Sequence, residues 1–134
     1  MVNEARLACE DVVRKSFRLI DDGHAGASAD CYTADATLVM AAAQEVRAEG
    51  AQIRAAMRRR EQEDRRTLHV VSPSSFELDA DRAECHCDLQ VFALSDPATA
   101  PNLRTLSRVH DVLKREDGQW LIAERRITVL AGGR

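Results

Sequence analysis

The sequence has 134 residues, a net charge of −3, an apolar fraction of 45% and a charged fraction of 31%. These values are typical of one soluble globular domain, 1–134, which is large enough to fold without disulfides or a structural metal. The slightly negative charge gives no reason to expect a nucleic-acid partner, and no apolar run is long enough to span a bilayer. A cytoplasmic location is therefore the default expectation, and the four cysteines are expected to be reduced thiols.

The first part of the chain is predicted to be mainly helical. Between residues 4 and 22, apolar side chains recur at spacings of three and four, which is the period of an amphipathic helix. Gly23 suits the residue that ends such a helix. A short helical turn is expected over 25–31, and a further helix over 51–64 after the break at Gly50.

Strands are predicted for most of the remaining chain. A short pair of strands comes before the helix over 51–64, and four long strands follow that helix. Turn residues separate the long strands, as at Asp79-Ala80-Asp81 and Glu116-Asp117-Gly118. Pro73 indicates a bulge or bend inside the first long strand. The predicted strands are 36–42, 44–49, 67–78, 82–94, 103–115 and 119–130.

Helices followed by consecutive long strands indicate an α+β fold with a mainly antiparallel sheet. Such a sheet, curved around the N-terminal helix, would leave a cone-shaped cavity in which a small ligand could bind. Both faces of the sheet are partly apolar, as on the strand that holds Leu89, Val91 and Phe92. One face would cover the cavity and the other would need a partner, which favours a homodimer.

Asp21 continues the apolar stripe of the first predicted helix, because it lies four residues after Phe17 and eight after Val13. It also lies near the helix C-terminus, where the helix dipole disfavours a carboxylate. A partly buried acid in that position needs a partner, and a histidine across the cavity would provide one. Alternatively, Asp21 is a solvated helix-end residue like its neighbour Asp22.

His69 lies inside the apolar run Arg66–Ser72, just after the charged helix over 51–64. A histidine there is either a hydrogen-bonded core residue or the acid/base group of a pocket. If it pairs with Asp21, its other ring nitrogen could exchange a proton with a ligand. His110, on a later strand, is likewise either an ordinary strand residue or part of a site.

Neither a metal nor a cofactor is expected from the sequence. Cys85 and Cys87 alternate along a strand and point to the same face, but with His86 alone they cannot supply a tetrahedral zinc site. The chain also has no glycine-rich loop of the kind that binds phosphate groups.

Four segments of the chain, taken together, resemble a known family. They are Leu19–Gly23, Tyr32–Thr37, Arg66–Val71 and Lys114–Ala123, and their order and spacing cover nearly the whole sequence. In these segments the chain resembles the nuclear transport factor 2-like superfamily, and within it the SnoaL-like domains. The resemblance implies a cone-shaped α+β barrel, with N-terminal helices packed on a curved sheet, and this fold carries many functions.

Scytalone dehydratase has a similar fold and pairs an aspartate at the end of its first helix with a histidine on a strand. The resemblance places that pair at Asp21 and His69, and it matches a serine of a late strand with Ser107. A second histidine of that enzyme corresponds to Leu94 here, so the match is partial.

Ketosteroid isomerases share the fold as well. Their tyrosine, their aspartate base and their late-strand aspartic acid correspond to Ser16, Met40 and His110. Methionine cannot abstract a proton, so the isomerase mechanism is not expected, although His110 could donate a hydrogen bond to a ligand. Phe17 lies on the apolar stripe that leads to Asp21, and it is also expected to contact the ligand.

The expected function is acid/base chemistry on a small apolar ligand that carries a carbonyl or hydroxyl group, as in a lyase, an isomerase or a cyclase. His69 would transfer the proton and Asp21 would orient it. Two alternatives remain open: a non-catalytic small subunit of a ring-hydroxylating dioxygenase, and a homodimer that only binds a ligand.

Overall fold

A computed structural model describes residues 2–133, so Met1 and Arg134 of the predicted domain lie outside the described part. Helices and strands follow one another in the predicted order. Within the described residues, no helix is long and apolar enough to cross a membrane. The elements are α1 (Val2–Asp21), α2 (Ala25–Ser28), the 3-10 turn η1 (Ala29–Cys31), β1 (Tyr32–Ala41), β2 (Glu45–Glu49), α3 (Ala51–Gln62), β3 (Arg66–Val71), β4 (Ser75–Asp79), β5 (Arg82–Leu94), β6 (Asn102–Glu116) and β7 (Gln119–Ala131).

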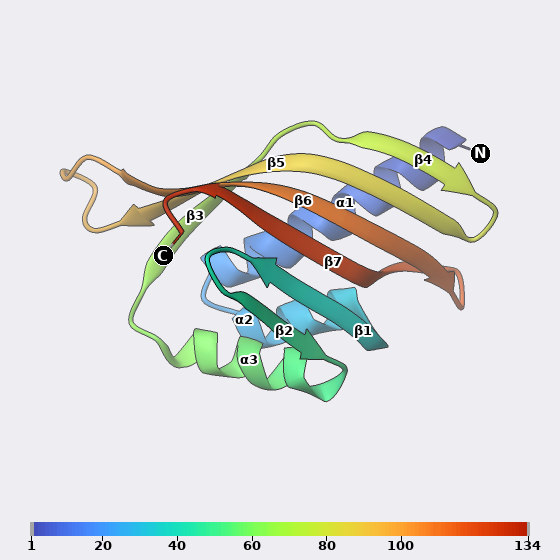
Figure 1. The fold of residues 1–134 in the computed structure, drawn as a ribbon, viewed down its shortest axis with the longest axis horizontal. Helices are drawn as coiled ribbons and strands as arrows, with labels where there is room; N and C mark the ends of the chain where they lie inside the picture. The colour runs from blue at the N-terminus through green and yellow to red at the C-terminus, as the bar shows by residue number, and fades with distance from the viewer. Residues whose placement is uncertain (1, 134) are drawn as a thin grey trace.

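The strands form one seven-stranded sheet in the order β2-β1-β7-β6-β5-β3, and β4 pairs with β5 beyond the end of β3. The pair β1–β7 is parallel, and the other pairs are antiparallel. Figure 1 shows the sheet curving across α1, with α2 and α3 gathered at one end. The α+β class, the N-terminal helices and the mainly antiparallel sheet are all confirmed.

The predicted strand over 67–78 is in fact two strands. Both pair with β5, but the chain leaves the sheet between Val71 and Ser75. Pro73 lies in this gap, where it has no N–H to donate to a neighbouring strand. Ser72 maintains the link to β5, because its N–H donates to the Asp88 carbonyl (3.0 Å) and its hydroxyl accepts from the Asp88 N–H (2.8 Å).

The first strand was also predicted too short. It begins at Tyr32 and not at residue 36, because Tyr32 already pairs with Ile122 of β7 before an irregularity in the ladder. Tyr32 is buried, as the first residue of β1.

The core lies between α1 and the concave face of the sheet. Cys9, Val13 and Phe17 of α1 are buried with side chains of β5, β6 and β7. Burial raises the pKa of Cys9 and Cys85 to about 12, so both stay neutral thiols at ordinary pH. These cysteines act as small apolar core residues and not as nucleophiles.

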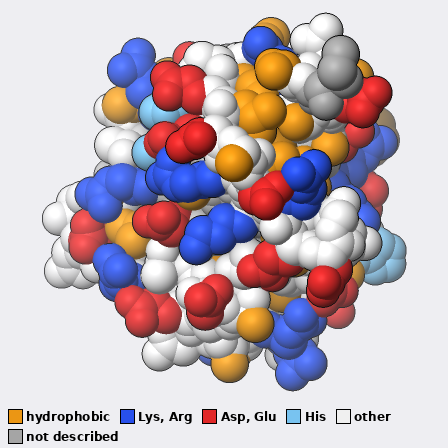
Figure 2. Space-filling view, turned by 90° about the vertical axis from the view of Figure 1, so that its right-hand side faces the viewer, with side chains coloured by type: hydrophobic (Ala, Val, Ile, Leu, Met, Phe, Trp, Pro, Cys, Tyr) orange, Lys and Arg blue, Asp and Glu red, His pale blue; other side chains and the backbone are white. Residues whose placement is uncertain are grey.

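The surface view in Figure 2 shows acidic and basic side chains interspersed over one side of the molecule, with apolar side chains gathered near its upper edge. This mixture matches the net charge of −3. The face shown in Figure 2 therefore does not present a broad patch of one charge.

Candidate functional site

The end of α1 fixes the position of Asp21. Gly23 has a φ of 86°, and its N–H bonds to the carbonyl of Ile20 (3.2 Å). The next N–H, from His24, bonds to the carbonyl of Leu19 (2.7 Å). These two bonds are the Schellman arrangement that ends many helices, and it requires the left-handed backbone that glycine adopts readily. Asp21 is thereby held as the last residue of α1.

Asp21 and His69 are joined directly. The Nδ1 atom of His69 lies 2.6 Å from Oδ1 of Asp21, and the backbone N–H of His69 donates to Oδ2 (2.8 Å). The Thr67 hydroxyl donates to Oδ1 of the same carboxylate (2.9 Å). Side chains alternate along a strand, so Thr67 and His69 both face inward while Leu68 between them is exposed.

These contacts determine the charge of the carboxylate. Burial by itself raises the pKa of Asp21, but hydrogen bonds from the His69 side chain, the His69 backbone and Thr67 more than offset it. The pKa of Asp21 therefore lies below its ordinary value, and the group is an ionised acceptor near neutral pH. An ionised carboxylate cannot donate, so Nδ1 of His69 must carry the proton of their bond.

Phe17 supports the pair from behind. Its ring stacks on the His69 ring, with the centroids 5.1 Å apart and the planes inclined by 20°. Phe17 also contacts Arg125, whose guanidinium carbon lies 4.3 Å from the centre of the phenyl ring. The His69 ring is thus held in place by a hydrogen bond at one edge and by an aromatic contact.

Arg125 belongs to a second ion pair, deeper in the core. Its Nε and Nη2 atoms donate to the two carboxylate oxygens of Asp111 (2.7 and 2.8 Å), and Nη1 donates to the Tyr32 hydroxyl (3.0 Å). Asp111 and Arg125 are 0% and 2% exposed. Burial opposes the guanidinium charge, but the Asp111 carboxylate outweighs it and raises the pKa of Arg125.

A cavity of about 360 Å³ opens beside His69, between α3 and the concave face of the sheet. Most of the surface that lines it is apolar, which suits a small organic ligand. The ionisable side chains that line it are His69 and three arginines. The complete lining is Ile20, Met40, Ala56, Met57, Arg60, Arg65, Thr67, His69, Val91, Ala93, Arg104, Thr105, Ser107, Ile127, Val129 and Gly132.

The structure brings some of the predicted site residues together and separates others. Met40 and Ser107 line the cavity with His69, and Phe17 lies behind His69. Ser16 is fully buried, and its hydroxyl donates to the Val13 carbonyl of its own helix (2.6 Å), so it does not reach the cavity.

His110 does not lie in this cavity. It is on the convex face of the sheet, where its Nε2 atom lies 2.7 Å from Oε1 of Glu84. The inward side chains of β6 are those of Ser107, Val109 and Asp111, all buried. His110 is therefore not placed to contact a ligand in the cavity, and the acidic residue of β6 that faces the core is its neighbour Asp111.

The sequence reasoning missed the residues that connect the pair to its surroundings. Arg60 donates from Nη2 to the Thr67 hydroxyl (3.0 Å), which in turn donates to Asp21. Thr67 could have been found, because it is two residues before His69 and must share its face of the strand. Arg60 and Asp21 are far apart in the sequence, so no local pattern signals their connection.

The described residues contain one group of histidine and acidic side chains with converging ligand atoms, and it does not lie in the cavity. It consists of Glu84, His86 and His110 on the convex face of the sheet. Within residues 2–133, no such group is formed around His69.

Comparisons with known proteins agree with this architecture. A comparison with curated protein sequences found no match. An NTF2-like protein with a cystatin-like fold from Novosphingobium aromaticivorans is 20% identical, with a TM-score of 0.80 over 97% of this chain and 84% of that chain. ActVI-ORFA from Streptomyces coelicolor is 18% identical, with a TM-score of 0.81 over 97% and 98% of the two chains. A protein from Catenulispora acidiphila, solved in complex with S-DNPA, is 18% identical, with a TM-score of 0.78 over 95% and 94%.

These structural relatives share the NTF2-like fold, and at such low identity they show the fold alone. The family model of the SnoaL-like domain matches residues 2–126. The match spans every element from α1 into β7. The chain therefore belongs to the SnoaL-like domain family.

Proposed function

We propose that this protein is a cofactor-independent lyase, isomerase or cyclase that uses Asp21 and His69 for acid/base chemistry on a small molecule. The carrying observation is the 2.6 Å contact between Asp21 Oδ1 and His69 Nδ1 at the wall of a mainly apolar cavity. Because Nδ1 is occupied by Asp21, Nε2 is the ring nitrogen left for a ligand. In the neutral ring that atom is an acceptor, so it can take a proton from a ligand and return it elsewhere.

Asp21 would act as a positioning residue in this scheme. Its carboxylate fixes the tautomer and orientation of the imidazole, and it stabilises the positive ring that forms when Nε2 takes a proton. Phe17 limits rotation of the same ring by stacking on it. The Ser107 hydroxyl, which also lines the cavity, could hydrogen-bond a carbonyl or hydroxyl group of the ligand.

The arginines of the cavity indicate the character of the ligand. Three arginines line the cavity: Arg60, Arg65 and Arg104. Among the described residues 2–133, no aspartate or glutamate lines it. Burial and the neighbouring Arg65 lower the pKa of Arg60, while Glu63 and Asp21 act in the opposite direction, and Arg65 is itself paired with Glu63 (2.8 Å). A ligand with an apolar body and a carboxylate or enolate oxygen would complement the arginines of the cavity.

The comparisons support a small-molecule enzyme. One solved relative from Novosphingobium aromaticivorans, 16% identical with a TM-score of 0.80, carries the provisional name scytalone dehydratase. The Catenulispora relative was solved with a small molecule bound. An open cavity also favours this proposal over a non-catalytic subunit, for which a filled or closed cone is expected.

The test uses proton exchange, because it does not require the natural substrate. Purified protein is incubated in D₂O with a panel of cyclic ketones that carry a carboxylate, and deuterium incorporation next to the carbonyl is followed by NMR. We expect the wild-type protein to accelerate exchange on some member of the panel, and His69→Ala to remove the acceleration while its circular dichroism spectrum stays unchanged. His24→Ala, at an exposed histidine outside the cavity, is the matched control. Equal exchange by His69→Ala and wild type would refute the mechanism.

The ligand's charge is tested separately by binding. The carboxylate form of a bound compound is compared with its methyl ester, and we expect the acid to bind more tightly to wild type and the difference to shrink in Arg104→Ala. Arg108→Ala removes an exposed arginine that lies on the convex face and serves as the control. If acid and ester bound equally to wild type, the proposal that the ligand is anionic would be wrong. The proposed acid/base role of Asp21 and His69 would be unaffected.

A homodimer remains part of the proposal. Apolar side chains are exposed along the convex face near one end of the sheet, among them Leu68, Val70 and Leu106. Covering such a surface would favour association of two copies. Light scattering coupled to size-exclusion chromatography should give the mass of a dimer, and a monomer at micromolar concentration would count against it.

A further inference from the structure

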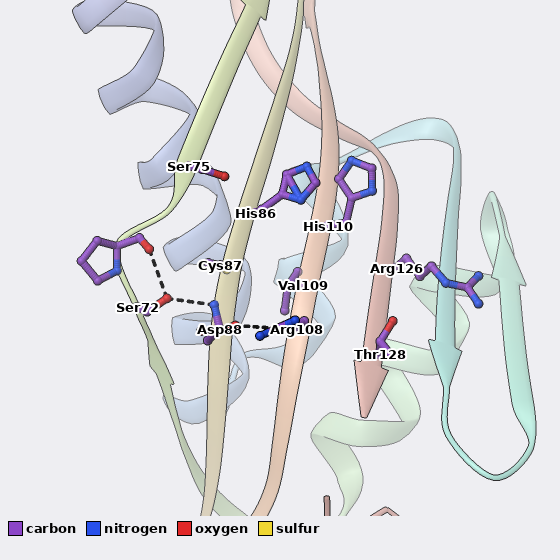
Figure 3. Close-up of a pocket in the computed structure, with 11 residues that line it drawn as sticks. Ser72, Ser75, His86, Cys87, Asp88, Arg108, Val109, His110, Arg126 and Thr128 are labelled. Atoms are coloured by element: carbon purple, nitrogen blue, oxygen red, sulfur yellow. Dashed lines mark hydrogen bonds and ion pairs between the residues drawn. The ribbon is translucent and has the colours of Figure 1, made fainter. Parts of the chain in front are cut away.

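The convex face of the sheet carries two histidines directly opposite one another. His86 of β5 and His110 of β6 are register partners in the antiparallel ladder, so both side chains leave the sheet from neighbouring points. Their rings are stacked, with centroids 4.2 Å apart and planes inclined by 21°. Figure 3 shows the two rings side by side above the strands, on the opposite face from the helices.

Glu84 adds a carboxylate to this pair. It lies two residues before His86 on β5, so strand alternation places both side chains on the same face. Its Oε1 atom is 2.7 Å from Nε2 of His110. One ligand atom from each of the three residues lies within 4.8 Å of those of the other two. Donors of a tetrahedral zinc site are about 3.3 Å apart, given Zn–N bonds of about 2 Å, so small side-chain rotations would close the set.

The arginines near this cluster are paired with acidic side chains, so their positive charge is compensated. Arg108 pairs with Asp88 (3.5 Å), and Arg126 pairs with Glu45 (3.2 Å). Arg82 donates to Oε2 of Glu84 (3.0 Å), and this contact leaves Oε1 directed at His110. Arg108 and Arg126 are thus paired with acidic residues outside the cluster, whereas Arg82 is paired with Glu84 itself and orients its carboxylate.

The cluster is accessible to solvent. A hollow of about 370 Å³ on the convex face is lined by His86 and His110, together with Ser75 and Thr128. The His110 side chain is 41% exposed and that of Glu84 is 27% exposed. Three protein ligands with open space beside them leave room for water to complete the coordination of a metal ion.

We propose that Glu84, His86 and His110 form a binding site for a divalent transition-metal ion, with Zn²⁺ as the best-suited metal. Two imidazoles and one carboxylate are a ligand set that suits Zn²⁺ and related borderline metals, whereas Mg²⁺ and Ca²⁺ prefer oxygen ligands alone. The site lies on the opposite face of the sheet from His69, so it is independent of the proposed acid/base pair. Its ligands join β5 to β6, and a bound ion would cross-link the two strands.

The experiment is a titration of the full chain with zinc chloride in competition with a chromophoric chelator. We expect saturable binding of one Zn²⁺ per chain. His86→Ala, His110→Ala and Glu84→Gln should each weaken it by about tenfold or more, since even outer-sphere partners of metal sites contribute 10–100-fold to affinity. Binding should also raise the melting temperature of wild type and not that of His86→Ala.

Two matched variants distinguish this site from other sources of zinc affinity. His24→Ala removes an exposed histidine elsewhere, and His69→Ala removes the histidine of the cavity; both should bind Zn²⁺ like wild type. His86 is exposed, so its replacement by alanine should leave the fold intact, which circular dichroism would verify. Unchanged affinity in His86→Ala, loss of affinity in His69→Ala instead, or no saturable binding to wild type would each overturn the proposal.

Discussion

Two aspartates of this chain each hold a cationic or basic partner, but in different surroundings. Asp111 and Arg125 form a two-point ion pair in the core, and a third Arg125 nitrogen, Nη1, donates to the Tyr32 hydroxyl. At the wall of a cavity, the Asp21 carboxylate contacts the His69 ring only at Nδ1, which leaves Nε2 of the ring available. The first pair is buried away from any ligand, whereas the second has a ring nitrogen that can still react.

The comparison shows how a core position and a candidate reactive position differ physically. Both carboxylates are buried, and both are hydrogen-bonded as buried charges must be. Burial alone therefore does not identify the site. The distinguishing features are a titratable partner with a vacant ring nitrogen and an adjacent space that admits a ligand.

The largest effect should come from breaking the core pair. Asp111→Ala leaves the Arg125 guanidinium buried without its carboxylate, and we expect it to lower the free energy of unfolding by about 3–5 kcal/mol. Urea denaturation followed by circular dichroism measures the change. A loss below about 1 kcal/mol would mean that the core relaxes to admit water or another partner, contrary to a purely structural role for this pair.

A smaller loss of stability is expected at the cavity. Asp21→Ala removes the acceptor of three hydrogen bonds, but His69 and Thr67 can reach water in the cavity. We expect the free energy of unfolding to fall by about 1–3 kcal/mol, while proton exchange on the ketone panel is lost. Asp22→Ala, at the exposed neighbour, is the control and should change neither quantity. A destabilisation as large as that of Asp111→Ala would remove the distinction between the two pairs.

The Asp21–His69 pair should also make the stability of the fold depend on pH. The pKa of Asp21 is lower in the folded protein than in the unfolded chain, so the folded state binds fewer protons and stability falls as the pH decreases. The contribution of this carboxylate is complete above its unfolded pKa of about 4 and is lost as the pH falls through the lower folded value. In urea denaturation between pH values of about 2 and 5, which cover the unfolded pKa and the range below it, Asp21→Asn should flatten this part of the profile. If the profile of Asp21→Asn ran parallel to that of wild type, these contacts would not lower the pKa of Asp21.

The sequence predicted the local elements better than the contacts between them. Helical period, turn residues and Gly23 each act over a few neighbouring residues, and the α+β order follows from them. The break at Pro73 was indicated by the residue itself, but the separation into β3 and β4 depends on how Ser72 bonds to β5.

The errors at the site have a different origin. His110 and Asp111 are adjacent, and which of them faces the core depends on the register of β6 against β5 and β7. A shift of one residue moves a side chain to the opposite face, and the polar residues His110 and Asp111 do not by themselves indicate which of them faces the core. The cluster of Glu84, His86 and His110 was missed for the same reason, because its members come from two strands that only the sheet brings together.

The smallest expected effect would sharpen the comparison most, because it removes a single hydroxyl of the Asp21 network and leaves both Asp21 and His69 in place. Thr67→Val keeps the shape of the side chain but removes the hydroxyl that donates to Asp21 and accepts from Arg60. We expect a loss of about 1 kcal/mol in the free energy of unfolding, the usual contribution of one hydrogen bond. The pKa of Asp21 should rise toward its ordinary value, because the Thr67 hydroxyl is one of the donors that lower it. ¹³C NMR of the labelled carboxylate measures this pKa, and Thr105→Val, on the same cavity wall without this contact, is the control. If the pKa of Asp21 stayed at its wild-type value, the His69 contacts alone would account for its ionisation, and the network would reduce to the Asp21–His69 pair.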